Sequence, residues 1–379
     1  MDRATGKKVR VLRPLFPMPF TVPLPPAPCP PKDNVAVDPL THALLGSATA
    51  RVVLARPLGR SAWFPGVAGA LLPDADALIR SGADPLLYAE FHRHFTHALA
   101  FIPIGGALAA LPWLLARRTR PHWKAYLGAA TAGYATHGLL DASTTYGTVL
   151  FWPLTDMRVA WNAISIVDPL FTLVLLLGVA LAVWRRTRAP AAVALLVCAA
   201  YLTTGAVQRD RALDAQGRIA AARGHDRARG AVFPGFGNNL VWRSLYLAGD
   251  TQYMDRIRVP WFGTPSWSPG PQVRLLREEE LAPEVLADAR LRRDFARFER
   301  FADGWVARAP GEPDVIGDAR YSSAAERFEP VWGIRFTPES ADVPIEWVDR
   351  SRQRRVDLRA LWTELRGADP RYRPIAPVR

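Results

Sequence analysis

The stretch EFHRHFTHALAFIPIGGALAALPWLLA, residues 90–116, joins a cluster of histidines to a long apolar segment without a break. The histidines are His92, His94 and His97, and the whole chain has only 7. The segment that follows them, residues 98–116, reaches the length of about 20 apolar residues that a helix needs to cross the core of a bilayer. The stretch therefore predicts ionisable side chains at the end of a transmembrane helix.

Other segments of the chain are also apolar, some strongly and some more weakly. Two of them are almost free of charge, residues 163–184 and 190–207. Three weaker ones are rich in Ala, Gly and Leu but carry His and Asp, as interior helices of a membrane bundle can: residues 38–55, 62–79 and 123–140. We therefore predict a mainly α fold, a multi-pass transmembrane helical bundle followed by a soluble domain. Buried helices of a soluble protein are the alternative for every segment.

The basic residues are distributed as in an inner-membrane protein. The net charge is +13, and short basic clusters lie between the apolar segments: Arg51, Arg56 and Arg60, then Arg117, Arg118, Arg120 and Lys124, then Arg185, Arg186 and Arg188. Such clusters mark the cytoplasmic side of membrane proteins. The connections 80–97 and 141–162 carry few arginines, so we expect them on the opposite side. Basic patches interleaved with aromatic residues are not apparent, and we expect no direct binding of nucleic acid.

The two ends of the chain differ in composition from the apolar part. Residues 1–36 are proline-rich and are expected to form a disordered tail, although a signal peptide or a translation start near Val37 would also explain them. The helical membrane domain is expected over residues 37–207. Residues 208–379 contain turn-forming clusters around β-like runs at 240–247 and 331–336, and amphipathic helical patterns at 284–302 and 356–366. We expect a small soluble α+β domain there, on the non-cytoplasmic side.

Ligand-type side chains lie in or at the ends of the apolar segments, where a charge is costly unless it is paired, solvated or bound to metal. On the predicted path through the membrane, one layer would receive most of them: His42, Asp74, Asp76, His97, His137, Asp141 and Asp168. His137 and Asp141 are four positions apart and project from one helical face. Asp74 and Asp76 can converge only if a helix ends there, as Pro73 indicates. One histidine of the 92–97 cluster is not expected to be a ligand.

Several short motifs occur in an order typical of one known family. They are DPLTHALLG (38–46), PDAD (73–76), HRHFTH (92–97) and HGLLDASTTYG (137–147), followed by WP (152–153) and DPLF (168–171). Over residues 37–175 the chain resembles the membrane-bound metal-dependent hydrolase family, also described as LexA-binding inner-membrane hydrolases of the YdjM type. The family pattern H-R-x-x-T-H falls on His92, Arg93, Thr96 and His97, so the resemblance implies that His94 is the variable position.

The candidate site follows from the residues and the resemblance together. The predicted metal ligands are His42, Asp74, Asp76, His92, His97, His137, Asp141 and Asp168, and the candidate catalytic residues are Asp74, Asp76 and Arg93. Structural roles are the alternatives: Asp168 and Asp38 can start a helix, and Asp74 and Asp76 can end one. Arg93 can orient a carboxylate, bind an anionic substrate or anchor at lipid headgroups. Thr145 and Tyr146 are expected to donate hydrogen bonds to the ligands.

The mixture of imidazole nitrogen and carboxylate oxygen suits Zn²⁺, Mn²⁺ or Fe²⁺ better than Ca²⁺ or Mg²⁺. The ligand set is larger than one zinc ion needs, so the sequence predicts two divalent ions, with zinc or manganese favoured. We expect an integral membrane hydrolase that cleaves a phosphoester or ester, in a small molecule or a lipid, through a metal-activated water. The alternative is a non-enzymatic membrane protein, either a regulator that binds a protein partner or a metal carrier.

Overall fold

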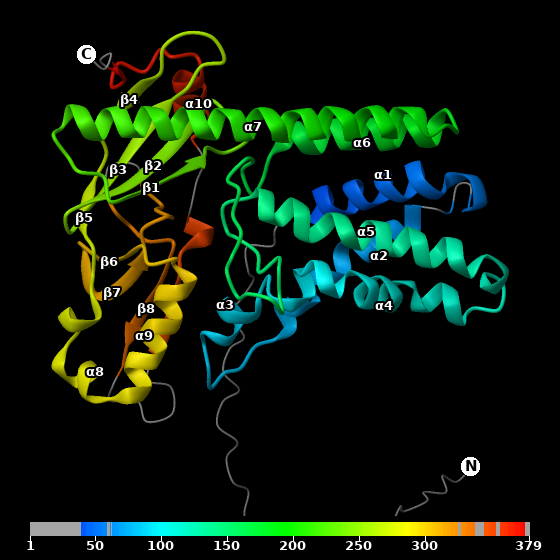
Figure 1. Ribbon diagram of the computed structural model, residues 1–379, viewed down its shortest axis with the longest axis horizontal. Helices are drawn as coiled ribbons and strands as arrows, with labels where there is room; N and C mark the ends of the chain where they lie inside the picture. Colours follow the sequence, from blue (N-terminus) through cyan, green and yellow to red (C-terminus); the bar gives the residue numbers. More distant parts are fainter. Residues whose placement is uncertain are drawn as a thin grey trace, which may run out of the picture. The chain divides into compact units, whose positions relative to one another are not determined.

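The computed structural model describes residues 39–58, 61, 63–324, 327–337, 345–353 and 357–375 (Figure 1). The expected disordered tail at residues 1–36 and the expected helix start at Asp38 lie outside the described residues. The first group of helices comprises α1 (Pro39–Leu58), α2 (Trp63–Leu71), α3 (Leu87–Phe91), α4 (Ile102–Leu115) and α5 (Trp123–Ser143). Between them lie the 3-10 helices η2 (Leu72–Leu78), η3 (Phe95–His97), η4 (Leu99–Phe101) and η5 (Arg120–His122).

Helices α1, α2 and α5 pack at very short range through small residues. A Cβ atom added at Gly133 would lie 2.1 Å from the carbonyl oxygen of Gly66, and one added at Gly66 would lie 2.5 Å from the carbonyl oxygen of Gly46. Only glycine permits such an approach of two backbones, and stripes of small residues are how helices without large apolar side chains pack tightly. This packing brings the ends of α1, α2 and α5 close to one another.

Helices α6 (Pro169–Trp184) and α7 (Ala189–Ala222) lie side by side (Figure 1). Large apolar side chains on both helices are exposed, among them Leu177 on α6 and Leu196 on α7. The second half of α7 is polar along one side and packs its small and apolar residues, such as Ala212 and Ile219, against strands of the first sheet.

The predicted multi-pass transmembrane bundle is wrong. In the described part of the chain, α7 is the one helix that is long and apolar enough to cross a membrane, and a second span arises only if the bent pair Leu87–His97 and Leu99–Leu115, which turns by 60°, counts as one. A stretch of sequence with few charged residues can indicate an apolar segment, but it does not show at which residue a helix begins. Leu99–Phe101 form the 3-10 helix η4, so that α4 begins only at Ile102 and has 14 residues, and α6 begins only at Pro169 and has 16.

The rest of the chain contains two antiparallel sheets. The first has the order β1-β2-β3-β4-β10, with β5 also paired to β3: β1 (Arg229–Pro234), β2 (Val241–Ala248), β3 (Thr251–Arg258), β4 (Ser266–Ser268), β5 (Gln272–Arg274) and β10 (Arg373–Pro374). The second has the order β6-β7-β8-β9: β6 (Val306–Ala309), β7 (Glu312–Asp318), β8 (Trp332–Phe336) and β9 (Ile345–Asp349). The fold is thus a combination of helices with antiparallel sheets.

Helix α9 (Ala289–Phe301) supports the loops that carry the candidate site. Its buried residues, such as Phe295 and Phe298, form one hydrophobic cluster with the second sheet and with Leu86 and Tyr146. The short helices α8 (Pro283–Ala287), η6 (Glu278–Glu280) and η7 (Ser351–Gln353) and helix α10 (Leu358–Leu365) complete the described structure. The cluster joins the C-terminal part of the chain to the turn before His92.

Candidate metal centre

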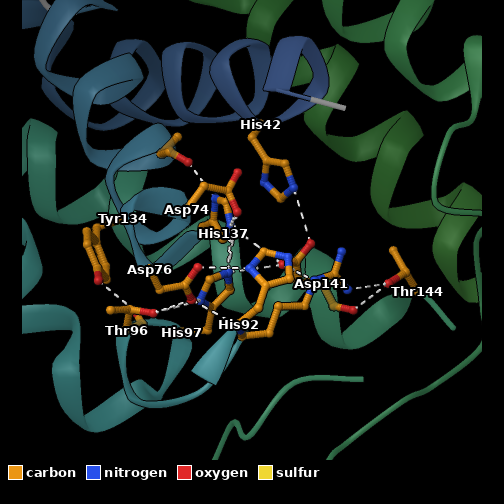
Figure 2. A network of polar contacts seen from close by, with 12 residues as sticks. His42, Asp74, Asp76, His92, Thr96, His97, Tyr134, His137, Asp141 and Thr144 are labelled. Atoms are coloured by element: carbon orange, nitrogen blue, oxygen red, sulfur yellow. Dashed lines mark hydrogen bonds and ion pairs between the residues drawn. The ribbon is translucent and has the colours of Figure 1, made fainter. Parts of the chain in front are cut away.

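The candidate residues come from four separate segments and converge (Figure 2). Their sources are α1 for His42, η2 for Asp74 and Asp76, the turn between α3 and η4 for His92, Arg93 and His97, and α5 for His137 and Asp141. Helix α2 ends at Leu71 and η2 begins at Leu72, with Pro73 in the first turn of η2, a position that proline fits. This change of helix type is what turns the two aspartates toward the histidines.

Four ligand atoms form the centre of this group. They are Nε2 of His97, Nε2 of His137, Oδ1 of Asp74 and one carboxylate oxygen of Asp141, all within 4.8 Å of one another. The two imidazole nitrogens are 3.0 Å apart. Oδ2 of Asp141 lies 3.2 Å from His97 Nε2 and 3.5 Å from His137 Nε2, and Asp74 Oδ1 lies 3.4 Å from His137 Nε2. All but Asp74, whose side chain is 26% exposed, are buried.

Hydrogen bonds behind the two imidazoles determine how they face the group. His137 Nδ1 donates to the carbonyl oxygen of Ala70 at 2.5 Å, and His97 Nδ1 lies 3.1 Å from Oδ2 of Asp76. With the proton on Nδ1, each ring presents the lone pair of Nε2, and such bonds orient metal-ligating histidines in general. Two lone pairs that face each other at 3.0 Å require a positive charge between them. A proton supplies it in the metal-free protein, and a metal ion supplies it with two carboxylates as further ligands.

The carboxylates point to a metal ion independently of the imidazoles. Within the described residues, Oδ1 of Asp74 and both oxygens of Asp141 are buried and accept no hydrogen bond of favourable geometry. Burial favours the neutral form of Asp141, but Arg93 and His137 outweigh it and hold the pKa of Asp141 well below its usual range. The nitrogens nearest to these oxygens, in Arg93 and the histidines, form ion-pair contacts but no well-aligned hydrogen bonds, and buried anionic oxygens in that situation are rare in proteins unless a cation is bound. The residues therefore fit a divalent metal ion.

Asp76 orients other members of the group. Its Oδ1 lies 2.9 Å from His92 Nδ1, and its Oδ2 accepts hydrogen bonds from the backbone N–H of Arg93 at 2.9 Å and from the hydroxyl of Thr96 at 2.8 Å. Burial raises the pKa of Asp76, but His92 and His97 outweigh it and hold that pKa below its usual range. Asp74, Asp76 and His92 also have ligand atoms within 4.8 Å of one another, so Asp74 belongs to two candidate groups.

Arg93 points into the protein. Its side chain is 1% exposed, its Nε lies 3.0 Å from Oδ2 of Asp141, and its guanidinium donates to the hydroxyl of Thr144 at 3.0 Å. The ring of Tyr146 lies under it, 4.9 Å from the guanidinium carbon. Its backbone has φ of 62°, a left-handed conformation that is costly for a residue other than glycine. Arg93 therefore balances the charge of Asp141, and its buried guanidinium faces away from solvent.

The remaining predicted ligands lie at different distances from the centre. His42 Nε2 lies 3.2 Å from Oδ1 of Asp141, and its ring stacks on His137 at 3.9 Å. Asp168 lies outside both candidate groups: it begins α6 by accepting hydrogen bonds from the N–H groups of Leu170 and Phe171, and it also accepts one from the hydroxyl of Tyr201. The Nε2 atom of His94 lies 3.8 Å from exposed Asp156, and His94 belongs to neither group.

The sequence did not predict several residues that hold the candidate metal ligands in position. The hydroxyl of Tyr134 donates to the carbonyl of Thr96, and Thr144 rather than Thr145 contacts Arg93. A Cβ atom added at Gly138 would lie 2.2 Å from the carbonyl oxygen of His97, so this glycine allows α5 to approach the histidine turn. In the sequence, only the position of Gly138 directly after His137 in THGLLD could have indicated this close approach.

The chain was compared with known proteins at the level of families, curated proteins and solved structures. The curated proteins and the solved structures give no match. The sequence profile of the family described as YdjM inner membrane protein matches residues 37–212. This range contains all the helices α1 to α5 and every residue of the candidate metal centre, and it ends within α7. Residues 37–212 of this chain therefore belong to the YdjM inner membrane protein family.

Proposed function

We propose that this protein is a metal-dependent hydrolase of the membrane, whose metal ion is bound by Asp74, His97, His137 and Asp141. The observation that carries the proposal is the convergence of two imidazole lone pairs and two carboxylate oxygens, with each imidazole held from behind by a hydrogen bond. Two nitrogens and two oxygens suit zinc or manganese. The inner-membrane family supports the location.

The charges of the side chains indicate how many metal ions the site binds in the absence of substrate. Asp74, Asp76 and Asp141 bring three negative charges, and Arg93 compensates one of them. One divalent cation balances the remaining two when the histidines are neutral. A second cation, at the group of Asp74, Asp76 and His92, would leave an excess of positive charge that an anionic substrate would balance. The proposal is therefore one resident ion, with a second one bound together with a phosphoester.

The side chains divide the remaining tasks among themselves. A bound divalent cation supplies Lewis acidity, which activates water and polarises the oxygen of the scissile group. Asp74 is the partly exposed member of the group, so substrate and water would reach the centre beside it. Burial raises the pKa of Asp74, but His137 and His97 outweigh it and keep this carboxylate ionised. A carboxylate held ionised in this way is a good metal ligand but a weak base, so we assign Asp74 to binding the ion and not to accepting the proton of the attacking water. Asp76 and Arg93 hold His97 and Asp141 in place.

A measurement of hydrolysis by the purified, metal-loaded full chain tests this proposal. The substrates are a chromogenic phosphodiester, a chromogenic carboxylic ester and a phospholipid in mixed micelles. The variants His137→Ala and Asp141→Ala should lose at least about 100-fold in kcat/KM, because each removes a ligand. His94→Ala is the matched control, since His94 lies in the same HRHFTH motif but outside the metal group, and it should retain activity.

Two results would contradict the hydrolase. If His137→Ala and Asp141→Ala cleave a substrate as fast as the unaltered chain, the site is elsewhere. If the unaltered chain binds metal tightly and cleaves none of the substrates, a metal carrier or a regulator that binds a protein partner accounts for the centre better.

A further inference from the structure

Helix α7 has two halves of different character, and the boundary between them can be placed. Residues 189–207 carry no charged side chain, and at 1.5 Å per residue they cover about 28 Å, close to the thickness of a hydrocarbon core. Exposed Val207 ends this half, and Gln208, Arg209, Asp210 and Arg211 follow it directly. If α7 crosses the membrane, the interface between lipid and water lies at residues 207–211.

Polar side chains at this boundary hold two other segments of the chain at the same level. The guanidinium of Arg209 donates to the carbonyl oxygen of Trp161 at 2.9 Å. Arg211 donates to the carbonyl oxygens of Pro260 at 2.8 Å and Trp261 at 3.3 Å. These contacts belong to the connection between α5 and α6 and to the connection between β3 and β4. Both connections are therefore attached to α7 where its apolar half ends.

Gln208 and Asn239 fix the second connection more firmly. The amide of Gln208, which is buried, donates to the carbonyl oxygens of Asn239 and Val259. The indole N–H of Trp261 donates to the side chain of Asn239 at 3.1 Å. The tip of the connection is thus held in position, although most of the surface of its aromatic side chains is exposed.

Those aromatic side chains are exposed. Phe262 is 90% exposed, Trp261 57% and Trp161 40%. Arg209 and Arg211 are two positions apart, which separates them by about 200° around the helix, so Trp161 and Trp261 are held on opposite sides of α7. Exposed tryptophan beside arginine is the composition of a membrane interface, where the ring enters the headgroup layer and the cation contacts phosphate.

We propose that Trp161, Trp261 and Phe262 form an interfacial anchor that inserts into the lipid headgroup layer around α7. Lipid is the occupant that the positions favour, because these side chains continue the exposed apolar surface of α7 at the level where its charges begin. The anchor would fix how deep the metal centre lies relative to the headgroups. It depends on α7 crossing the membrane and not on hydrolase activity.

Collision accessibility of spin labels tests the anchor in the full-length protein. The background carries Cys29→Ser and Cys198→Ala, and the nitroxide is attached to Phe262→Cys, to Trp161→Cys or, as a control, to Asp250→Cys. Asp250 lies in the turn at the other end of the β2–β3 hairpin, about 26 Å along the strand from Val241. The protein is reconstituted into vesicles of phosphatidylcholine and phosphatidylglycerol, and relaxation by oxygen is compared with relaxation by water-soluble chromium oxalate.

The anchor predicts that oxygen, which concentrates in lipid, relaxes the labels at positions 262 and 161 several-fold more, relative to chromium oxalate, than the label at position 250. If the labels at 262 and 250 are equally accessible to chromium oxalate, the tip lies in water and the proposal is wrong. If the labels at 262 and 161 are shielded from both reagents, a protein surface covers them, and this too overturns the proposal. Agreement between positions 262 and 161 guards against a local effect of one substitution.

Discussion

At the scale of single residues, the hydrogen bond from His137 Nδ1 to the carbonyl of Ala70 decides what the other nitrogen of the ring can do. The spacing of His137 and Asp141 was enough to predict that both project from one face of a helix. It could not indicate Ala70, because that contact joins positions 67 apart in the chain. Nor could sequence patterns separate residues that face the centre from those that support it, such as Asp76 and Arg93.

Asp76 offers the clearest residue-scale prediction. Asp76→Asn removes the negative charge and leaves one acceptor oxygen, which cannot serve both His92 on the Oδ1 side and Thr96 and His97 on the Oδ2 side, so the bond that orients His97 weakens. We expect metal affinity to fall by about 10- to 100-fold while the fold is retained. Competition with a chromogenic chelator measures this change. Asp156→Asn, at an exposed carboxylate, is the control and should bind metal normally. Equal affinities of the two variants would argue against an orienting role for Asp76.

The pH dependence of metal binding is a second residue-scale prediction. Burial lowers the pKa of His137, but the negative charge of Asp141 and the polar contacts of His137 with Asp141 at 3.5 Å and Asp74 at 3.4 Å outweigh burial and raise that pKa. In the metal-free protein Nε2 of His137 therefore binds a proton more firmly than the Nε2 of a free imidazole does, and the metal ion must displace that proton. Affinity should increase by about tenfold per pH unit for each proton released, up to the raised pKa. Calorimetric titrations at several pH values would measure this affinity, and an affinity that does not change with pH would show that no proton is displaced.

At the scale of elements, the apolar segments were found by composition but their helical boundaries were not. Residues 163–168 are as apolar as the start of a span, yet α6 begins only where Asp168 accepts hydrogen bonds from the first N–H groups of the helix. The histidine cluster breaks the segment before α4 into two 3-10 turns, because His92, Arg93 and His97 are bound to other elements. Tertiary contacts therefore decided where these helices start.

Gly138 is the residue at which helix α5 approaches the turn that carries His97. Gly138→Ala would place a Cβ atom 2.2 Å from the carbonyl of His97, so α5 and the histidine turn must separate. Overpacking of this kind costs about 1–3 kcal/mol of unfolding free energy, and the displaced His97 should weaken metal binding as well. Gly311→Ala is the control, since nothing lies within 4 Å of the added atom. Chemical denaturation in detergent and chelator competition measure both effects. A variant with unchanged stability and affinity would show that the turn can shift without cost.

At the scale of the whole molecule, the C-terminal part is tied to the turn that carries the histidines. Arg297 of α9 forms ion pairs with Asp84, just before α3, at 2.9 Å and with Glu90, within α3, at 2.7 Å. The hydrophobic cluster around Phe298 includes Leu86 from the same turn. Composition predicted strands and helices after residue 208, and the structure contains them. It could not predict this contact, because long-range pairs leave no local pattern.

Arg297→Ala tests the importance of that connection. Its partners are 34% and 43% exposed, so solvent screens the pairs and the loss of unfolding free energy should be modest, about 1 kcal/mol. The turn before His92 should exchange its amide protons faster in the variant, whereas α6 should be unchanged. Hydrogen–deuterium exchange with mass spectrometry reports both regions. Identical exchange of the turn in variant and unaltered chain would show that the cluster alone holds it.

The central claim is that Asp74, His97, His137 and Asp141 bind a divalent transition metal. Elemental analysis of the detergent-purified full chain, after loading with zinc or manganese and removal of the excess, tests it most directly. We expect about one equivalent per chain in the unaltered protein and in His94→Ala, and almost none in Asp141→Asn and His137→Ala. Absence of metal from the unaltered chain, or the same metal content in Asp141→Asn, would contradict it.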